Sequence, residues 1–162
     1  MNLIGQIINA MIAYYAGDVR RINHFLKVYG FAKAIGEMEG LDESTQEIIE
    51  IAALTHDIGI KNSEKKYNSS AGNYQQIEGP PEAKKLLEGL GIESGVIDRV
   101  CWLIAHHHTY TDIQGIDYQI LVEADFLVNF YEDDMSNDSI HSDGGKMFKT
   151  LSGKAILNAI YA

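Results

Sequence analysis

The sequence has little cysteine and little proline. Its 162 residues include one cysteine, Cys101, and two adjacent prolines, Pro80 and Pro81. A single cysteine cannot form an internal disulfide, which excludes a disulfide-stapled secreted fold and fits a reducing compartment, so we expect a cytoplasmic protein. With prolines confined to one place, helices elsewhere can run without interruption.

Basic residues and long hydrophobic runs are also scarce. There are 13 Lys and Arg against 23 Asp and Glu, a formal net charge of −10, which repels polyanions and argues against binding of a nucleic-acid polymer. The apolar stretch over residues 3–15 is interrupted by Gln6 and Asn9. It is too short for a membrane span and lacks the charged start of a signal peptide. We therefore expect no membrane association and interpret this stretch as a core helix.

Apolar residues recur at helical spacing along most of the chain, and period-2 alternation never lasts more than a few residues. This pattern predicts an all-α fold, a single-domain helical bundle of about six to seven helices. The domain should span residues 1–162, with a core over 18–131 and a C-terminal helix over 147–161. Residues 132–145 are acidic and rich in Ser and Gly, which predicts irregular structure.

The pattern weakens between residues 60 and 79, where Lys, Asn, Ser and Gly predominate. We expect a loop here, serving as a lid or substrate loop, with Lys61 and Lys65 available to phosphates. The alternatives are a disordered surface excursion and, for the lysines, an ordinary solvated face. Pro80 and Pro81 are expected to begin the next helix.

A run of aliphatic residues over 48–54 ends in His56 and Asp57, followed by Gly59. An unpaired imidazole or carboxylate costs several kcal/mol to bury, and one divalent metal satisfies both. Neighbouring helical side chains point about 100° apart, so both can reach one ion only near a helix end. The dipeptide taken alone is explained as well or better by a capping His–Asp hydrogen bond.

Other polar residues lie on or beside apolar helical faces. His24 lies beside the apolar face of residues 22–35, and Asp125 lies within the apolar face of residues 118–128. The triplet His106, His107 and His108 ends another apolar helix. Three consecutive histidines cannot all face one site, and we expect His106 to face solvent. A lone histidine beside an apolar face is more often a satisfied core residue than a ligand.

The order of these residues, a histidine, then His-Asp, then Asp in an all-helical chain, resembles the HD-domain metal-dependent phosphohydrolase superfamily. The resemblance rests on three segments, His24-Phe-Leu-Lys-Val28, Ala52-Ala-Leu-Thr-His56-Asp57-Ile-Gly59 and Glu123-Ala124-Asp125-Phe-Leu.

The resemblance implies one or two divalent metal ions. The ligands of the first ion would be His24, His56, Asp57 and Asp125. This set lacks thiolates and suits Mn, Fe, Mg, Co, Ni or Zn. One histidine of the two-metal members is missing, so Glu78, with His106 or His107, is the candidate for a second metal or a phosphate. The catalytic residues would be Asp57, His107 and His108.

Three functions follow from the sequence. The first is a phosphohydrolase that uses metal-activated water on a small phosphate ester, most plausibly a nucleotide. The second is an HD-type di-iron oxygenase. The third is a non-catalytic metal- or nucleotide-binding module. The expected partner is a small phosphorylated substrate, and the sequence leaves open whether the chain forms a homo-oligomer.

Overall fold

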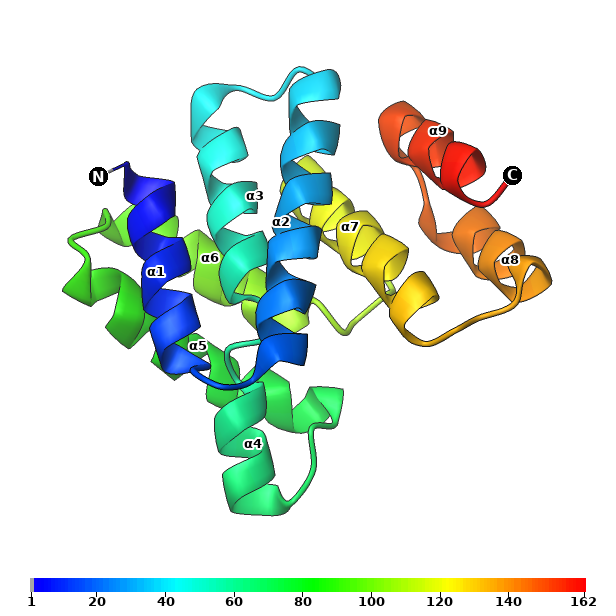
Figure 1. Ribbon diagram of the computed structural model, residues 1–162. Helices are drawn as coiled ribbons and strands as arrows, with labels where there is room; N and C mark the ends of the chain where they lie inside the picture. Colours follow the sequence, from blue (N-terminus) through cyan, green and yellow to red (C-terminus); the bar gives the residue numbers. More distant parts are fainter. Residues whose placement is uncertain (1) are drawn as a thin grey trace.

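The computed structural model describes residues 2–162, and these form nine helices and no strand (Figure 1). The all-α prediction is confirmed, with more helices than the six to seven expected. The helices are α1 (Leu3–Tyr14), α2 (Val19–Met38), α3 (Glu43–Thr55), α4 (Ile60–Tyr67), α5 (Gly72–Gly89), α6 (Ser94–His106), α7 (Ile116–Glu132), α8 (Asn137–Met147) and α9 (Leu151–Ile160).

Helices α2, α3 and α7 pack against one another, and α6 joins them through α3. Their apolar faces form a continuous core in which residues such as Val28, Leu54 and Leu121 are fully buried. Each such side chain contributes about 1.5–3 kcal/mol when removed from water. Helix α1 lies beside α3 and buries Ile7 and Met11, as expected for a core helix. Within residues 2–162, no helix is both long and apolar enough to cross a membrane.

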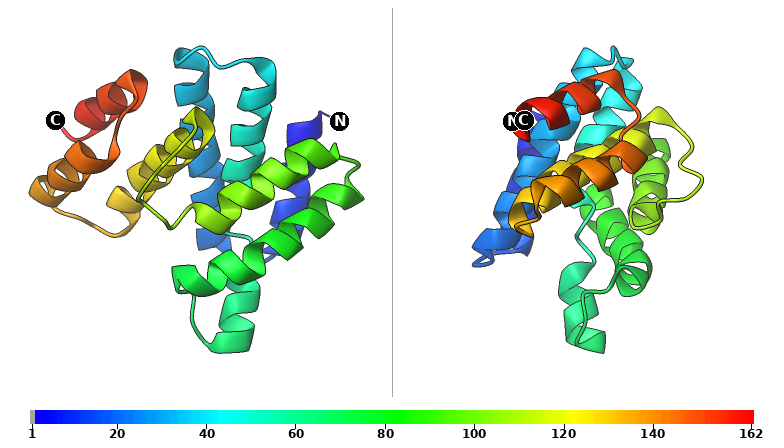
Figure 2. Two further views of the ribbon diagram at one scale, coloured as in Figure 1. Left: turned by 180° about the vertical axis from the view of Figure 1, so that it is seen from behind. Right: turned by 90° about the vertical axis from the view of Figure 1, so that its right-hand side faces the viewer.

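The predicted loop over residues 60–79 is wrong, because this region forms α4 and the start of α5. Helix α4 and the turn that follows it extend away from the body in both views of Figure 2, whereas α5 packs along α6. Asn68, in the left-handed conformation with φ of 51°, ends α4. The rings of Tyr67 and Tyr74 stack across the turn between α4 and α5 with centroids 4.2 Å apart.

The prediction that the two prolines start a helix is also wrong, since both lie inside α5. Tertiary packing holds this helix in place despite the missing backbone donors. A Cβ on Gly59 would lie 2.7 Å from the backbone nitrogen of Gly79, and a Cβ on Gly79 would lie 2.6 Å from Cγ2 of Ile104. The absence of side chains at these two glycines lets α5 fit between the start of α4 and α6.

The C-terminal part of the chain is more regular than expected, because residues 137–147 form α8, capped by Ser136. Glu123 of α7, which is fully buried, forms hydrogen bonds with the segment that joins α8 to α9. Its carboxylate accepts hydrogen bonds from the Thr150 hydroxyl at 2.6 Å and from the backbone nitrogens of Lys149 and Thr150 at 2.9 and 3.1 Å. Glu123 is therefore a structural carboxylate, although it lies two positions from Asp125.

Candidate metal centre

His56 and Asp57 lie directly after α3, where the helix ends. The His56 ring is completely buried, and its Nδ1 lies 2.7 Å from the carbonyl oxygen of Ala53. A carbonyl only accepts, so Nδ1 carries the hydrogen in the neutral ring and Nε2 presents a lone pair. Asp57 is held by its backbone, whose carbonyl accepts from the Tyr15 hydroxyl at 2.8 Å.

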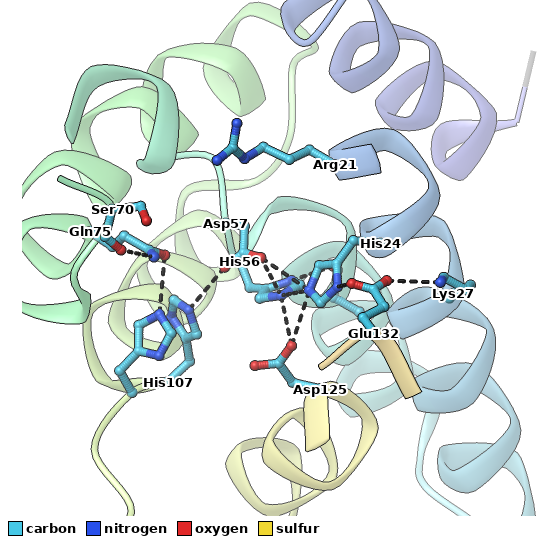
Figure 3. Close-up of polar contacts among 12 residues, drawn as sticks. Arg21, His24, Lys27, His56, Asp57, Ser70, Gln75, His107, Asp125 and Glu132 are labelled. Atoms are coloured by element: carbon cyan, nitrogen blue, oxygen red, sulfur yellow. Dashed lines mark hydrogen bonds and ion pairs between the residues drawn. The ribbon is translucent and has the colours of Figure 1, made fainter. Parts of the chain in front are cut away.

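Helices α2 and α7 bring two more side chains to the same point (Figure 3). Nε2 of His24 lies 3.1 Å from Oδ2 of Asp57, 3.2 Å from Oδ1 of Asp125 and 3.3 Å from Nε2 of His56. Nε2 of His56 lies 3.2 Å from Oδ2 of Asp57 and 3.4 Å from Oδ1 of Asp125. The four residues that the sequence resemblance assigned to a first ion therefore face one another across a few ångströms.

Two imidazole nitrogens and two carboxylate oxygens directed at one point repel one another unless a cation lies among them. In the metal-free protein that cation is a proton. Burial alone would lower the pKa of His24, but the carboxylates of Asp125 and Asp57 outweigh it and raise this pKa to about 10. The pKa of His56 is raised well above its ordinary value, since burial is outweighed by the charges of Asp57 and Asp125.

The two carboxylates shift in the opposite direction. Burial by itself would raise the pKa of Asp57, but the neighbouring histidines, His56 foremost, hold it well below its usual range. The pKa of Asp125 is lowered for the same reasons. Oδ1 of Asp125 is buried without a hydrogen bond. Such a donor set, with ionised carboxylates and a buried carboxylate oxygen that makes no hydrogen bond, fits a divalent metal ion.

A second group of side chains adjoins the first and shares Asp57 with it. The ligand atoms of Asp57, His107 and His108 all lie within 4.8 Å of one another. Nδ1 of His107 contacts the carbonyl oxygen of Ile104 at 2.7 Å, while its buried Nε2 points at Oδ1 of Asp57, 3.4 Å away, without a hydrogen bond. These three residues could hold a second cation.

Gln75 determines which nitrogen of His108 carries the hydrogen. The Gln75 amide nitrogen donates to the carbonyl oxygen of Ser70 at 2.7 Å, so its Oε1 faces Nε2 of His108 at 3.1 Å. Nε2 of His108 must then donate, which leaves Nδ1 free as a ligand atom. Burial, followed by the nearby His107, lowers the pKa of His108 to about 4, so its ring is neutral at pH 7.

The remaining histidine of the triplet lies elsewhere. The His106 ring stacks on Trp102 with centroids 3.9 Å apart, and its Nδ1 contacts the Trp102 carbonyl oxygen at 2.7 Å. The structure thus directs His107 and His108 to the centre and leaves His106 on the outer side of α6.

Three other candidates lie away from the centre. Glu78 pairs with Lys66, and Gln75 is the residue of α5 that faces the histidines. Lys61 donates to the carbonyl oxygen of Tyr14 at 3.0 Å, and Lys65 is exposed on α4. Neither these two lysines nor Glu78 lines the cavity described next.

A cavity of about 440 Å³ opens over the centre. Its cations are Arg20 and Arg21, which the sequence gave no reason to select. The Arg21 guanidinium contacts Asp18 at 2.8 Å and also pairs with Glu64 of α4. The full lining is Asp18, Arg20, Arg21, His24, Asp57, Ile60, Ser70, Gln75, His108, Asp125, Asn129 and Glu132.

Sequence reasoning missed Glu132 and Asn129, which share a face of α7 with Asp125. Their spacings of seven and four residues from Asp125 were the available signal, since residues so spaced lie on one side of a helix.

Comparison with known proteins settles the family. The sequence model of the HD domain matches residues 21–140, about three quarters of the chain. This chain belongs to the HD domain family. The HD chain is also similar in structure to a predicted HD superfamily hydrolase from an uncultured Thermotogales bacterium, with a TM-score of 0.68 and 21% sequence identity. That match covers 96% of this chain and 83% of the other. A search of the curated proteins found no match.

Proposed function

We propose that this HD protein is a metal-dependent phosphohydrolase that acts on a small phosphate ester. The observation that carries the proposal is the convergence of His24, His56, Asp57 and Asp125, among them a buried carboxylate oxygen that makes no hydrogen bond, at the floor of a cavity. Ligand sets of this kind belong to hard or borderline ions. A bound divalent ion of this type lowers the pKa of a coordinated water and neutralises charge on phosphate oxygens.

We further propose two ions, with Asp57 shared between them. Oδ2 of Asp57 faces His24 and His56, while Oδ1 faces His107. His107 and His108 would hold the second ion through the nitrogens that their other contacts leave free. Because His108 is neutral at pH 7, it serves better as a ligand than as the proton donor to a leaving group.

The cavity supports a phosphorylated substrate of modest size. Its volume of about 440 Å³ falls within the range of small-molecule sites, roughly 300–1,000 Å³. Arg20 and Arg21, which line it, are the arginines available to an anion, although Arg21 is shared with Asp18 and Glu64. Asn129 offers an amide group to the rest of the substrate. A nucleotide is our first candidate substrate.

The test is elemental analysis of the purified protein, followed by a screen of nucleotides and phosphomonoesters with Mn²⁺ or Co²⁺. We expect turnover of at least one ester, which Asp57→Ala abolishes. Metal binding without turnover of any ester would favour the binding module and refute the hydrolase. Iron together with an oxygen-dependent absorption band would favour the di-iron oxygenase.

A further inference from the structure

Each histidine whose Nε2 enters the centre has a hydrogen-bond acceptor on its other nitrogen. For His56 and His107 the acceptors are the backbone carbonyls of Ala53 and Ile104, both at 2.7 Å. For His24 the acceptor is a side chain, because Oε2 of Glu132 lies 3.0 Å from its Nδ1. The acceptor of His24 can therefore be removed by substitution, whereas the backbone acceptors of His56 and His107 cannot.

Glu132 also forms an ion pair with Lys27 of α2. Its Oε1 lies 2.8 Å from Nζ of Lys27, one turn along α2 from His24, so the carboxylate bridges the two residues (Figure 3). Its side chain is 13% exposed. Glu132 is the last residue of α7, where a negative charge is disfavoured by the helix dipole. The pair of contacts from α2 offsets that cost.

We infer that Glu132 is the positioning residue of His24, which it holds with Nε2 directed at the metal, and that Lys27 fixes Glu132 in turn. An acceptor on Nδ1 selects the tautomer that leaves Nε2 free, fixes the ring plane and increases the basicity of the ligand. The inference rests on the metal centre of the proposed function, but not on hydrolysis of any ester.

The experiment measures the affinity of the full-length protein for Mn²⁺ and Zn²⁺ by competition with a chelator. The variants are Glu132→Ala, Glu132→Gln and Lys27→Met. Matched controls come from a second buried ion pair that involves α2, since Glu50 is 9% exposed and contacts Lys33, itself about as exposed as Lys27 (44% against 43%). Glu50→Ala and Lys33→Met therefore remove comparable charges away from the centre.

Glu132→Ala should weaken metal binding about 10- to 100-fold. Glu132→Gln should recover part of this loss, since its amide oxygen can still accept from Nδ1, and Lys27→Met should weaken binding less than Glu132→Ala. In NMR spectra of the Zn²⁺-loaded protein, the Nδ1 hydrogen of His24 should be protected from exchange with water in the wild type, where it donates to Glu132, and should exchange faster in Glu132→Ala. The controls should alter thermal stability without altering metal affinity.

Three results would overturn the inference. Glu132→Ala could bind metal within about threefold of the wild type while remaining folded, or Glu50→Ala could weaken binding as much as Glu132→Ala. Glu132→Gln could also be as damaging as Glu132→Ala, which would mean that the negative charge and not the acceptor is needed. If the wild type binds no metal, the proposed function fails together with the inference, and this outcome is distinguishable because no variant is needed to see it.

Discussion

Metal affinity should fall steeply as the pH is lowered, because protons occupy the centre when the ion is absent. The pKa of His24 is about 10 in the metal-free protein, so its ring is protonated at pH 7 and must release a proton before Nε2 can bind a metal. The pKa of His56 is shifted in the same direction. The pKa values of Asp57 and Asp125 are lowered, so both carboxylates are already ionised and add no pH dependence above pH 5.

The number of protons that the metal displaces determines how steeply its affinity changes with pH. One displaced proton strengthens binding about 10-fold per pH unit, and two strengthen it about 100-fold. Nε2 of His24 and Nε2 of His56 lie 3.3 Å apart, which disfavours a proton on each. We therefore expect a slope between one and two over about pH 6.5–8.5, which amounts to at least about 100-fold in affinity across that range.

The assay is isothermal titration calorimetry with Mn²⁺ in buffers of different ionisation enthalpy, which counts released protons directly. His141→Gln is the control, since His141 lies on α8, where its Nε2 contacts the carbonyl oxygen of Tyr161 at 2.6 Å. It should leave the slope unchanged. A dissociation constant that does not change with pH, together with no proton release, would refute the electrostatic description of the centre.

The same shifts set the stability of the metal-free protein. The raised pKa of His24 contributes stability below about pH 6.5, and this contribution is lost as the pH rises towards 10. The lowered pKa values of the carboxylates contribute stability above about pH 4, which is lost as the pH falls further. Thermal unfolding without metal should therefore show its highest midpoint between about pH 4 and 6.5.

Three further predictions concern single residues. Asp125→Ala should lose bound metal while circular dichroism shows unchanged helical content; metal at wild-type stoichiometry would contradict the assignment. Gly59→Ala should destabilise the fold by about 1–3 kcal/mol in urea, because its Cβ would meet the backbone of Gly79, whereas Gly89→Ala, which has open space, should not destabilise it. Glu123→Ala should lower the free energy of unfolding by roughly 3 kcal/mol or more, because it leaves buried donors without an acceptor. A decrease below about 1 kcal/mol would show that water replaces the carboxylate.

The central fold and the convergence of four polar side chains at one point could be predicted because the residues concerned are out of place in their surroundings. Asp125 interrupts an otherwise apolar helical face, and His56 and Asp57 follow a largely aliphatic run. A polar group on a buried stripe needs a partner whatever the tertiary structure, so the pattern alone indicates a site.

Helix α4 and the part of α5 before Pro80 could not be predicted in the same way. Their sequence is polar, and Pro80 and Pro81 favour a helix start, whereas the packing of Gly79 between Gly59 and Ile104 is visible only in three dimensions. The expected loop was wrong because tertiary contact overrode local propensity.

The outer residues of the centre were missed for a related reason. Glu132 is followed by Asp133 and Asp134, so it looks like part of a solvated acidic segment until α2 is seen beside it. Glu78 and Gln75 lie on the same helix, and only the rotation of that helix determines that Gln75 faces His108. The sequence suggested Glu78 as the residue of α5 at the centre, but it could not show that Gln75, through its contact with His108, takes that place.

The neighbouring positions 123 and 125 give the C-terminal segment more than a peripheral role. The Asp125 carboxylate faces His24 and His56, while the Glu123 carboxylate, on another side of the same turn of α7, accepts the amide hydrogens at the entry to α9. Trimming the chain after α7 would remove every described donor from outside α7 that Glu123 has and leave this buried carboxylate with the Gln119 amide, two positions from Asp125. The family match ends at residue 140, yet a chain shortened to that boundary would carry the whole ligand set on a helix that has lost its anchor.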